Sequence, residues 1–183
     1  MKVTTYPIPG LLLIEPKRFG DARGWFAEVW QDHRYREAGI AEIFVQDNMA
    51  MSQKGVLRGL HYQLHHPQAK LVSVIWGEIF DVAVDVRRSS PTFGQWVGCV
   101  LSAENRDALW VPPGFAHGFL ALSDTVGLAY KCTDFYAPEH EHVIRWDDPD
   151  IGIEWPVENP IISEKDNQFQ KLSCITAEKL PSF

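Results

Sequence analysis

The decapeptide from Lys54 to Gln63 places an arginine and a histidine inside a run that otherwise has the composition of a β-strand. Arg58 and His61 are three positions apart, so on a regular strand they would face opposite sides. Gly59 between them permits a bulge that turns both side chains toward one cavity. A solvated arginine and a structural histidine on an edge strand are the alternative. A strand that gives up apolar packing to aim polar groups inward is typical of a functional site.

Alternation along two further strand candidates brings more polar side chains to inward faces. Tyr130 and Tyr136 share one side of their segment, and Gln46 shares a face with Asn48 while Asp47 points away. Each pair taken singly is also compatible with hydroxyls or amides that are satisfied within a core. Because the pairs converge on one cavity, we favour a binding site.

The segment that ends at His117 resembles the second half of the cupin signature, Pro-x-Gly-x-x-His, whose histidine usually binds a metal. The first half supplies further histidines and a glutamate, and the matching positions here are His61, Gln63 and Lys70. An ammonium repels a cation, and two histidines alone make a poor site for a divalent metal. Lys70 either reaches solvent along its aliphatic stem or acts as a fixed charge against a developing anion. We therefore expect a cupin-like barrel without a metal.

The net charge of −7 argues against a nucleic-acid-binding surface but is compatible with an anionic small ligand. The three cysteines, Cys99, Cys132 and Cys174, lie far apart and favour neither a zinc site nor a disulfide framework. We therefore expect a reduced, cytoplasmic location. No segment approaches the roughly 18 apolar residues of a membrane span. The N-terminal apolar run lacks the flanks of a signal peptide, so we expect a strand there and no membrane partner.

The 183 residues are enough for one domain, 1–183, with a single core. Short strand candidates recur with turn signals between them, which predicts an all-β, cupin-like jelly roll with an enclosed cavity. The candidates are 11–15, 25–30, 43–49, 56–63, 71–76, 79–86, 96–101, 108–111, 117–122 and 126–133. We also expect a helix over 32–38 with Asp32 as N-cap and Gly39 after its end, a helical turn at 103–106 and a short helix near 166–170. The proline-punctuated tail from Asp147 should wrap the barrel.

Five motifs, in order along the chain, resemble the dTDP-4-dehydrorhamnose 3,5-epimerase family. They are Asp21-x-Arg-Gly-x-Phe-x-Glu28, Gly55-Val-Leu-Arg-Gly-Leu-His-Tyr-Gln63, Pro113-Gly-Phe-Ala-His-Gly-Phe119, Tyr130-Lys-Cys-Thr-x-x-Tyr136 and Ser163-Glu-Lys-Asp166. The similarity runs from about Gly10 to Asp166. One departure is Ala50, where the family usually has a serine; the missing hydroxyl affects a secondary contact and not the chemistry.

The resemblance implies a dTDP-4-keto-6-deoxyhexose substrate whose C3 and C5 protons are acidified by the C4 ketone, so that no cofactor is needed. It implies inversion of both carbons of dTDP-4-dehydro-6-deoxy-D-glucose to give dTDP-4-dehydro-L-rhamnose. His61 would be the base, because the pKa of an imidazole lies near working pH, and Asp166 would orient it. Tyr130 would be the acid on the opposite face, and Lys70 would stabilise the enolate oxygen.

The resemblance also implies a set of substrate-binding side chains and a partner. The set comprises Arg23, Arg58 and Lys165 for the diphosphate, Gln46, Asn48 and His117 for sugar and phosphate oxygens, Glu28 and Tyr136 for the thymine, and in addition Asp47 and Glu141. N-terminal strands join the partner's sheet in the family, so we expect a homodimer in which Arg23 or Glu28 completes the neighbour's site. The segment 11–15 has the few charges of an edge strand that needs a partner.

Three alternatives stay open. A relative that epimerises C3 alone or C5 alone, or that serves an antibiotic sugar, would share the same catalytic residues. A metal-dependent cupin oxygenase or isomerase would depend on a bound metal. In a non-catalytic sugar-binding jelly roll, the set of His61, Asp166 and Tyr130 would serve no purpose.

Overall fold

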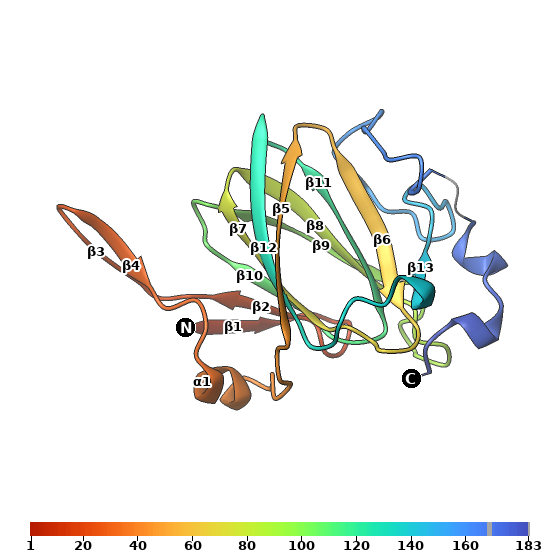
Figure 1. The fold of residues 1–183 in the computed structure, drawn as a ribbon, viewed down its shortest axis with the longest axis horizontal. Coiled ribbons are helices and arrows are strands. Elements are labelled where there is room, and N and C mark those ends of the chain that lie inside the picture. Colours follow the sequence, from red (N-terminus) through yellow and green to blue (C-terminus); the bar gives the residue numbers. More distant parts are fainter. Residues whose placement is uncertain (168–169, 183) are drawn as a thin grey trace.

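The structure is a computed structural model that describes residues 1–167 and 170–182. Two antiparallel β-sheets lie face to face (Figure 1). The six-stranded sheet has the order β1 (Lys2–Thr5), β2 (Leu12–Glu15), β10 (Ala108–Val111), β7 (Lys70–Trp76), β12 (Thr125–Cys132), β5 (Gln46–Gln53). The five-stranded sheet has the order β13 (Glu141–Val143), β6 (Leu57–Gln63), β11 (Phe115–Ala121), β8 (Glu78–Asp85), β9 (Trp96–Ser102). This arrangement confirms the predicted all-β, cupin-like jelly roll.

The inward faces of the two sheets make the main core. Val72 and Val74 of β7 pack with Phe115 and Phe119 of β11, and all four are buried. Alternation would place Trp76 on the same inward face, but 41% of its surface is exposed. The alternation therefore predicts the start of β7 correctly and fails at its end.

Part of each outer face is covered by a segment that is not a strand. Helix α1 (Asp32–Glu37) brings Tyr35 against Ile14 and Leu71 on the outside of the six-stranded sheet. The tail packs Ile144, Leu172 and other apolar residues on the outside of the five-stranded sheet, as predicted. Among its described residues, the last part of the chain has three single 3₁₀ turns, η1 (Pro138–His140), η2 (Leu172–Cys174) and η3 (Ala177–Lys179).

Local differences from the expected elements have simple causes. The N-cap of α1 is Gln31, whose Oε1 accepts a hydrogen bond of 2.7 Å from the backbone N–H of Arg34, so the cap lies one residue before Asp32. Residues 103–105 form a turn and not a helix, and residues 164–167 also form a turn. The remainder of the helix expected near 166–170 includes positions 168 and 169, which lie outside the described residues.

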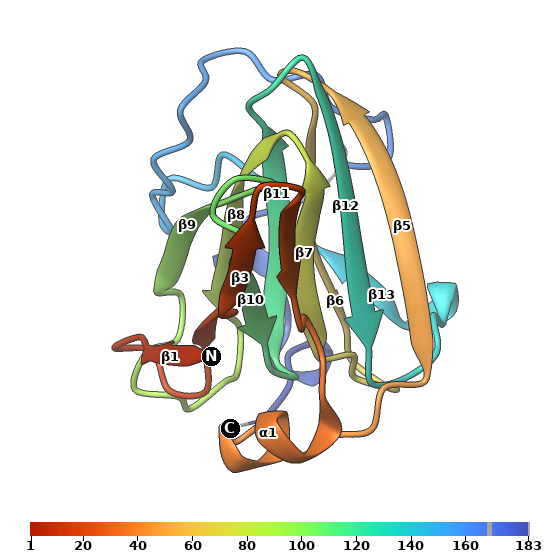
Figure 2. The same cartoon turned by 90° about the vertical axis from the view of Figure 1, so that its left-hand side faces the viewer.

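A hairpin of β3 (Arg18–Asp21) and β4 (Gly24–Ala27) extends away from the body of the molecule in Figure 1 and stands in front of the six-stranded sheet in Figure 2. It carries the exposed aromatic residues Phe19, Trp25 and Phe26. The segment 11–15 is not a free edge as expected, because β2 pairs with β1 on one side and β10 on the other. Within the described residues, no helix has the length and apolar character needed to cross a bilayer.

Candidate active site

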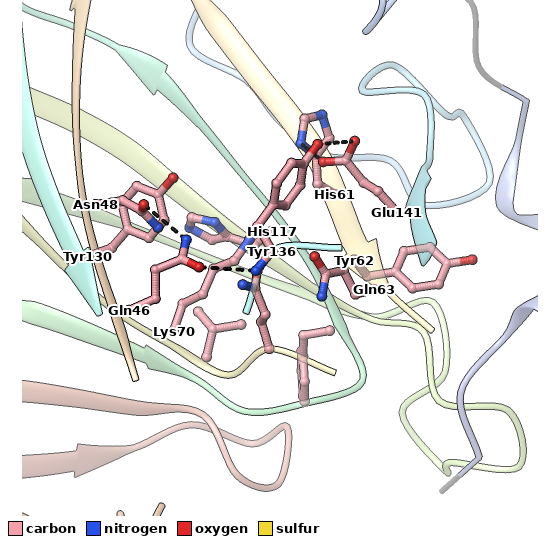
Figure 3. Close-up of a pocket in the computed structure, with 13 residues that line it drawn as sticks. Gln46, Asn48, His61, Tyr62, Gln63, Lys70, His117, Tyr130, Tyr136 and Glu141 are labelled. Carbon is pink, nitrogen blue, oxygen red and sulfur yellow. Dashed lines mark hydrogen bonds and ion pairs between the residues drawn. The ribbon is translucent and has the colours of Figure 1, made fainter. Parts of the chain in front are cut away.

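A pocket of about 310 Å³ opens between the two sheets, as Figure 3 shows. Strands β5, β7 and β12 supply its walls from the six-stranded sheet, and β6, β11 and β13 supply them from the five-stranded sheet. Eight of the side chains expected in the site line this pocket: Gln46, Asn48, His61, Lys70, His117, Tyr130, Tyr136 and Glu141. The structure therefore brings together polar residues that are up to 95 positions apart in the sequence.

His61 lies between two carboxylates. Its Nε2 is 2.9 Å from Oδ1 of Asp166, and its Nδ1 is 3.3 Å from Oε1 of Glu141. Asp166 is buried, and its other oxygen accepts a hydrogen bond of 3.4 Å from the backbone N–H of Gly59. Burial alone would lower the pKa of His61, but the hydrogen bonds with Asp166 and Glu141 outweigh it and raise the pKa above the usual 6.5. The imidazole is thus a stronger base than a free histidine.

Gly59 is needed where it stands. Its φ is +117°, and a Cβ there would lie 2.5 Å from the Cα of Gly118 on β11. The register between β6 and β11 shifts at this point, as the glycine predicted. Only His61 turns into the pocket, however. Arg58 instead donates to the hydroxyl of Ser52 at 3.1 Å and to the carbonyl of Met51 at 3.4 Å.

Tyr130 faces His61 from the other sheet. The two side chains lie on opposite sides of the pocket in Figure 3, because β12 and β6 belong to different sheets. Burial raises the pKa of the Tyr130 phenol above 10.0, the nearby Cys132 raises it further, and the positive charge of Arg58 opposes the rise. The phenol is therefore protonated at neutral pH and has a proton to donate.

Lys70 brings a cation to the floor of the same pocket. Its strand pairs with β12 so that Lys70 stands opposite Cys132, two residues from Tyr130. Burial lowers the pKa of the ammonium, and the charges of Glu141 and Asp81 act in the opposite direction. An ammonium at this position would interact favourably with an anionic oxygen of a bound substrate.

His117 also has a carboxylate partner, which sequence reasoning missed. His117 stands opposite His61 in the pairing of β11 with β6, and its Nε2 is 2.8 Å from Oδ1 of Asp81. Asp81 is fully buried, and its Oδ2 has no hydrogen-bond partner among the described residues. A carboxylate in the apolar run of β8 was the available signal, since a buried charge requires a partner.

Gln63 holds the loop that carries Tyr136. Its Nε2 donates to the carbonyls of His66 at 2.7 Å and Phe135 at 3.2 Å, and its Oε1 accepts from the N–H of Ala137 at 2.9 Å. Gln63 occupies a position where the cupin signature places a histidine, and all three of its contacts are to backbone groups. No cluster of three or more potential metal ligands occurs among residues 1–167 and 170–182. The absence of a metal stays a prediction.

Two amides line the wall opposite Glu141. Gln46 donates to Oδ1 of Asn48 at 3.1 Å and accepts from the N–H of Tyr136 at 3.1 Å. Ala50, two residues along β5, packs against the main core with its neighbour Leu128. A serine hydroxyl at position 50 would stand beside this apolar cluster.

Four of the expected binding residues do not line the pocket of this chain, and a fifth reaches it through another residue. Arg23 lies on the hairpin, paired with Asp21 and 90% exposed. Glu28 pairs with Arg34, Asp47 pairs with Lys131 on the outer side of the sheet as alternation predicts, and Arg58 turns to β5. Lys165 contacts Glu141, which lines the pocket.

Known proteins resemble this chain over most of its length. A family model described as dTDP-4-dehydrorhamnose 3,5-epimerase matches residues 5–173. A protein of that name from Pseudomonas aeruginosa is 55% identical over 170 residues, covering 92% of this chain and 94% of the relative.

Solved structures agree with the sequence comparison. A dTDP-6-deoxy-D-glucose-3,5-epimerase from Legionella pneumophila, in complex with dTDP-4-keto-L-rhamnose, superposes with a TM-score of 0.96 at 54% identity, covering 100% of this chain and 98% of that one. A 3'-monoepimerase from Streptomyces bikiniensis, in complex with dTDP-quinovose, has a TM-score of 0.89 at 37% identity, covering 97% of this chain and 91% of that one.

Proposed function

The chain belongs to the dTDP-4-dehydrorhamnose 3,5-epimerase family, and from this premise we propose how its own residues carry out the reaction. The protein is an isomerase that inverts C3 and C5 of dTDP-4-dehydro-6-deoxy-D-glucose to give dTDP-4-dehydro-L-rhamnose, a step of dTDP-L-rhamnose biosynthesis. Both carbons lie alpha to the C4 ketone, so each inversion consists of removing a proton from one face and returning one to the other.

His61 is the base in this proposal. Its hydrogen bond with the buried Asp166 fixes the ring and strengthens it as a base, which supports the assignment. The C–H bond breaks, its electron pair moves to the C4 oxygen as an enolate, and the proton passes to the imidazole.

Tyr130 then supplies the proton from the opposite face, and Lys70 stabilises the enolate. The observation that carries the proposal is the placement of His61 and Tyr130 on facing sheets of one pocket, which Lys70 on β7, the neighbour of β12, also lines. Inversion requires that the base and the acid address opposite faces of the substrate carbon, which side chains from facing sheets can do.

The remaining polar residues bind the nucleotide and the sugar in this proposal. Lys165 and Arg58 meet the diphosphate, Gln46, Asn48 and His117 bond oxygens of the sugar and phosphates, and Tyr136 stacks on the thymine. Arg23 and Glu28 belong to the neighbouring subunit's site. Their distance from the pocket of their own chain supports that assignment. Asp47 has no role in the pocket of this chain.

The test is solvent deuterium incorporation into the dTDP-4-keto sugar, followed by NMR. We expect label at both C3 and C5, together with inverted stereochemistry at both. Label at one carbon would indicate a single-carbon epimerase instead. The likeness to a 3'-monoepimerase makes this the second candidate, although the identity of 37% is well below the 54% to the Legionella 3,5-epimerase. No label at all would refute an epimerase.

We also propose that the protein is a homodimer. The hairpin exposes Trp25 and Phe26, and the outer face of the six-stranded sheet has an apolar groove of about 460 Å³ lined in part by Met49 and Ile75. Monomers rarely leave apolar surfaces of this kind uncovered. Trp30 does not add to this surface, because it packs on Tyr35 of its own chain at 4.5 Å between ring centroids.

A cytoplasmic location and a single functional domain complete the proposal. The three cysteines are unpaired, which supports a reducing compartment. Domain organisation would be tested by limited proteolysis, where one protected core is the expected result.

A further inference from the structure

The carboxylate of Glu141 is enclosed by three polar groups at the wall of the pocket. Its Oε1 is 3.3 Å from Nδ1 of His61, and its Oε2 contacts the ammonium of Lys165 and lies 3.4 Å from the hydroxyl of Tyr136. In the pairing of β13 with β6, Glu141 stands opposite Gln63 and thus diagonally across from His61. Only 10% of the Glu141 side chain is exposed, against 53% of Lys165.

The two carboxylates around His61 are not equivalent. A neutral imidazole carries one N–H, so only one of its nitrogens can donate a hydrogen bond, and the other would direct a lone pair at a carboxylate oxygen. Both contacts are favourable only when the ring is protonated. Asp166 is buried away from the pocket, whereas Glu141 lines it. The contact that changes when His61 loses its proton is therefore the one that faces the substrate.

We propose that Glu141 is a positioning residue that acts through His61: it accepts a hydrogen bond from the pocket-facing ring nitrogen when the ring is protonated, and it leaves that nitrogen to the substrate when the ring is neutral. This inference rests on the proposed role of His61 as the base. It gives Glu141 a task different from the substrate contact that the family resemblance implies.

The contact between Glu141 and His61 affects the energy of the reaction intermediate. When the C–H bond breaks, its electron pair goes to the C4 oxygen and the proton goes to the pocket-facing nitrogen of His61. The imidazolium so formed then donates to both Glu141 and Asp166. Glu141 is available for this at any working pH, because its hydrogen bonds with His61 and Lys165 overcome its burial and lower its pKa to about 2. The second carboxylate thus stabilises the state that contains the enolate.

Lys165 acts in the opposite direction on His61. Its ammonium pairs with Oε2 of Glu141 and places a positive charge near the ring. It therefore weakens the stabilisation of a protonated His61 by Glu141. The other groups that face His61 are Asp166 from the C-terminal turn and His117 from β11, with Tyr136 and Lys70 on further sides of the pocket. None of these groups is altered when Glu141 or Lys165 is replaced. The two replacements should therefore shift the pKa of His61 in opposite directions.

The test is an NMR titration of the His61 imidazole in the ligand-free protein, assigned with His61→Ala. We expect Glu141→Gln to lower the pKa of His61, because a carboxylate is lost and the shape is kept. Lys165→Met should raise it, because the cation that competes for Glu141 is gone. Glu139→Gln is the matched control: it removes a carboxylate two residues away whose partner is His140 at 3.9 Å, and the titration should not change.

Kinetics give the second readout. For Glu141→Gln we expect the acidic limb of kcat/KM to move to lower pH and the plateau kcat to fall about tenfold, a part of the roughly 10²–10⁴ that a general base contributes. An unchanged His61 titration with only a raised KM would overturn the proposal and leave Glu141 as a substrate contact. Shifts of the same sign in Glu141→Gln and Lys165→Met would overturn it as well. The titration needs no substrate, so it stands apart from the test of His61 as the base, which is the loss of deuterium exchange in His61→Ala.

Discussion

Replacing Tyr130 by phenylalanine should separate proton exchange from inversion. The change removes the proposed acid and leaves His61, Asp166 and Lys70 in place. Exchange needs only the base, since a carbanion can regain a proton from the side that lost it. Inversion needs a donor on the opposite face. We therefore expect solvent deuterium to enter the substrate at a rate close to that of the unmodified protein while epimerised product forms slowly.

The magnitude follows from the surroundings of the hydroxyl. Among the described residues no group hydrogen-bonds to the phenol oxygen of Tyr130, so its removal leaves no partner unsatisfied. The effect on unfolding free energy should stay within about 0.5 kcal/mol. A positioned general acid contributes about 10²–10⁴-fold, so inversion should slow by that factor, about 3–5 kcal/mol of barrier at roughly 1.4 kcal/mol per tenfold.

The assay is NMR in deuterated water, which follows label and stereochemistry in one sample. Tyr136→Phe is the comparison variant, because it removes a phenol hydroxyl on the His61 side of the pocket, next to Glu141. Its effect should reach exchange and inversion alike. If Tyr130→Phe also lost both in equal measure, the assignment of an acid on the facing sheet would be wrong.

Three further outcomes are expected. Asp166→Asn should move the acidic limb of the kcat/KM profile to lower pH, because the carboxylate helps to hold the pKa of His61 above 6.5 and its loss lets the ring stay neutral in more acidic solution; an unmoved limb would show that Asp166 does not act on the base. Activity should persist in excess chelator, since Lys70 and Gln63 stand where a cupin places ligands, and stoichiometric metal that tracks activity would contradict this. Trp25→Ser with Phe26→Ser should give a monomer with weaker nucleotide affinity in light scattering and binding assays, whereas a fully active monomer of the unmodified chain would refute the dimer.

Sequence reasoning located most strands because apolar alternation is set by which face of a sheet is buried. It placed Lys70 and Tyr130 on inward faces for the same reason. It missed β1, β3 and β13, which are four, four and three residues long, because such short segments become strands only when a neighbour supplies their hydrogen bonds. For Asp47 two predictions disagreed. Alternation predicted that its side chain points away from the pocket, whereas the family resemblance included it in the site.

The parts of the site that failed in prediction depend on tertiary contacts. Asp81 becomes a partner of His117 only after β8 has paired with β11. Arg58 was expected to turn inward with His61, but it donates to the hydroxyl of Ser52 on β5, which precedes β6 in the chain and belongs to the facing sheet. Neither contact has a signature in local spacing, because the first depends on the register between two strands and the second on how the two sheets face each other.

The backbone contacts of Gln63 bear on how easily this barrel could be converted into a metalloenzyme. Gln63→His together with Lys70→Glu would restore the ligand types of a metal-binding cupin. The imidazole, however, cannot reproduce the three hydrogen bonds that Gln63 makes to residues 66, 135 and 137, each worth about 0.5–1.5 kcal/mol. The loop that carries Tyr136 would therefore lose the hydrogen bonds that hold it in place when position 63 became a metal ligand. A conversion that keeps the pocket intact therefore requires a compensating change in the loop, and altering the ligands alone should weaken the pocket.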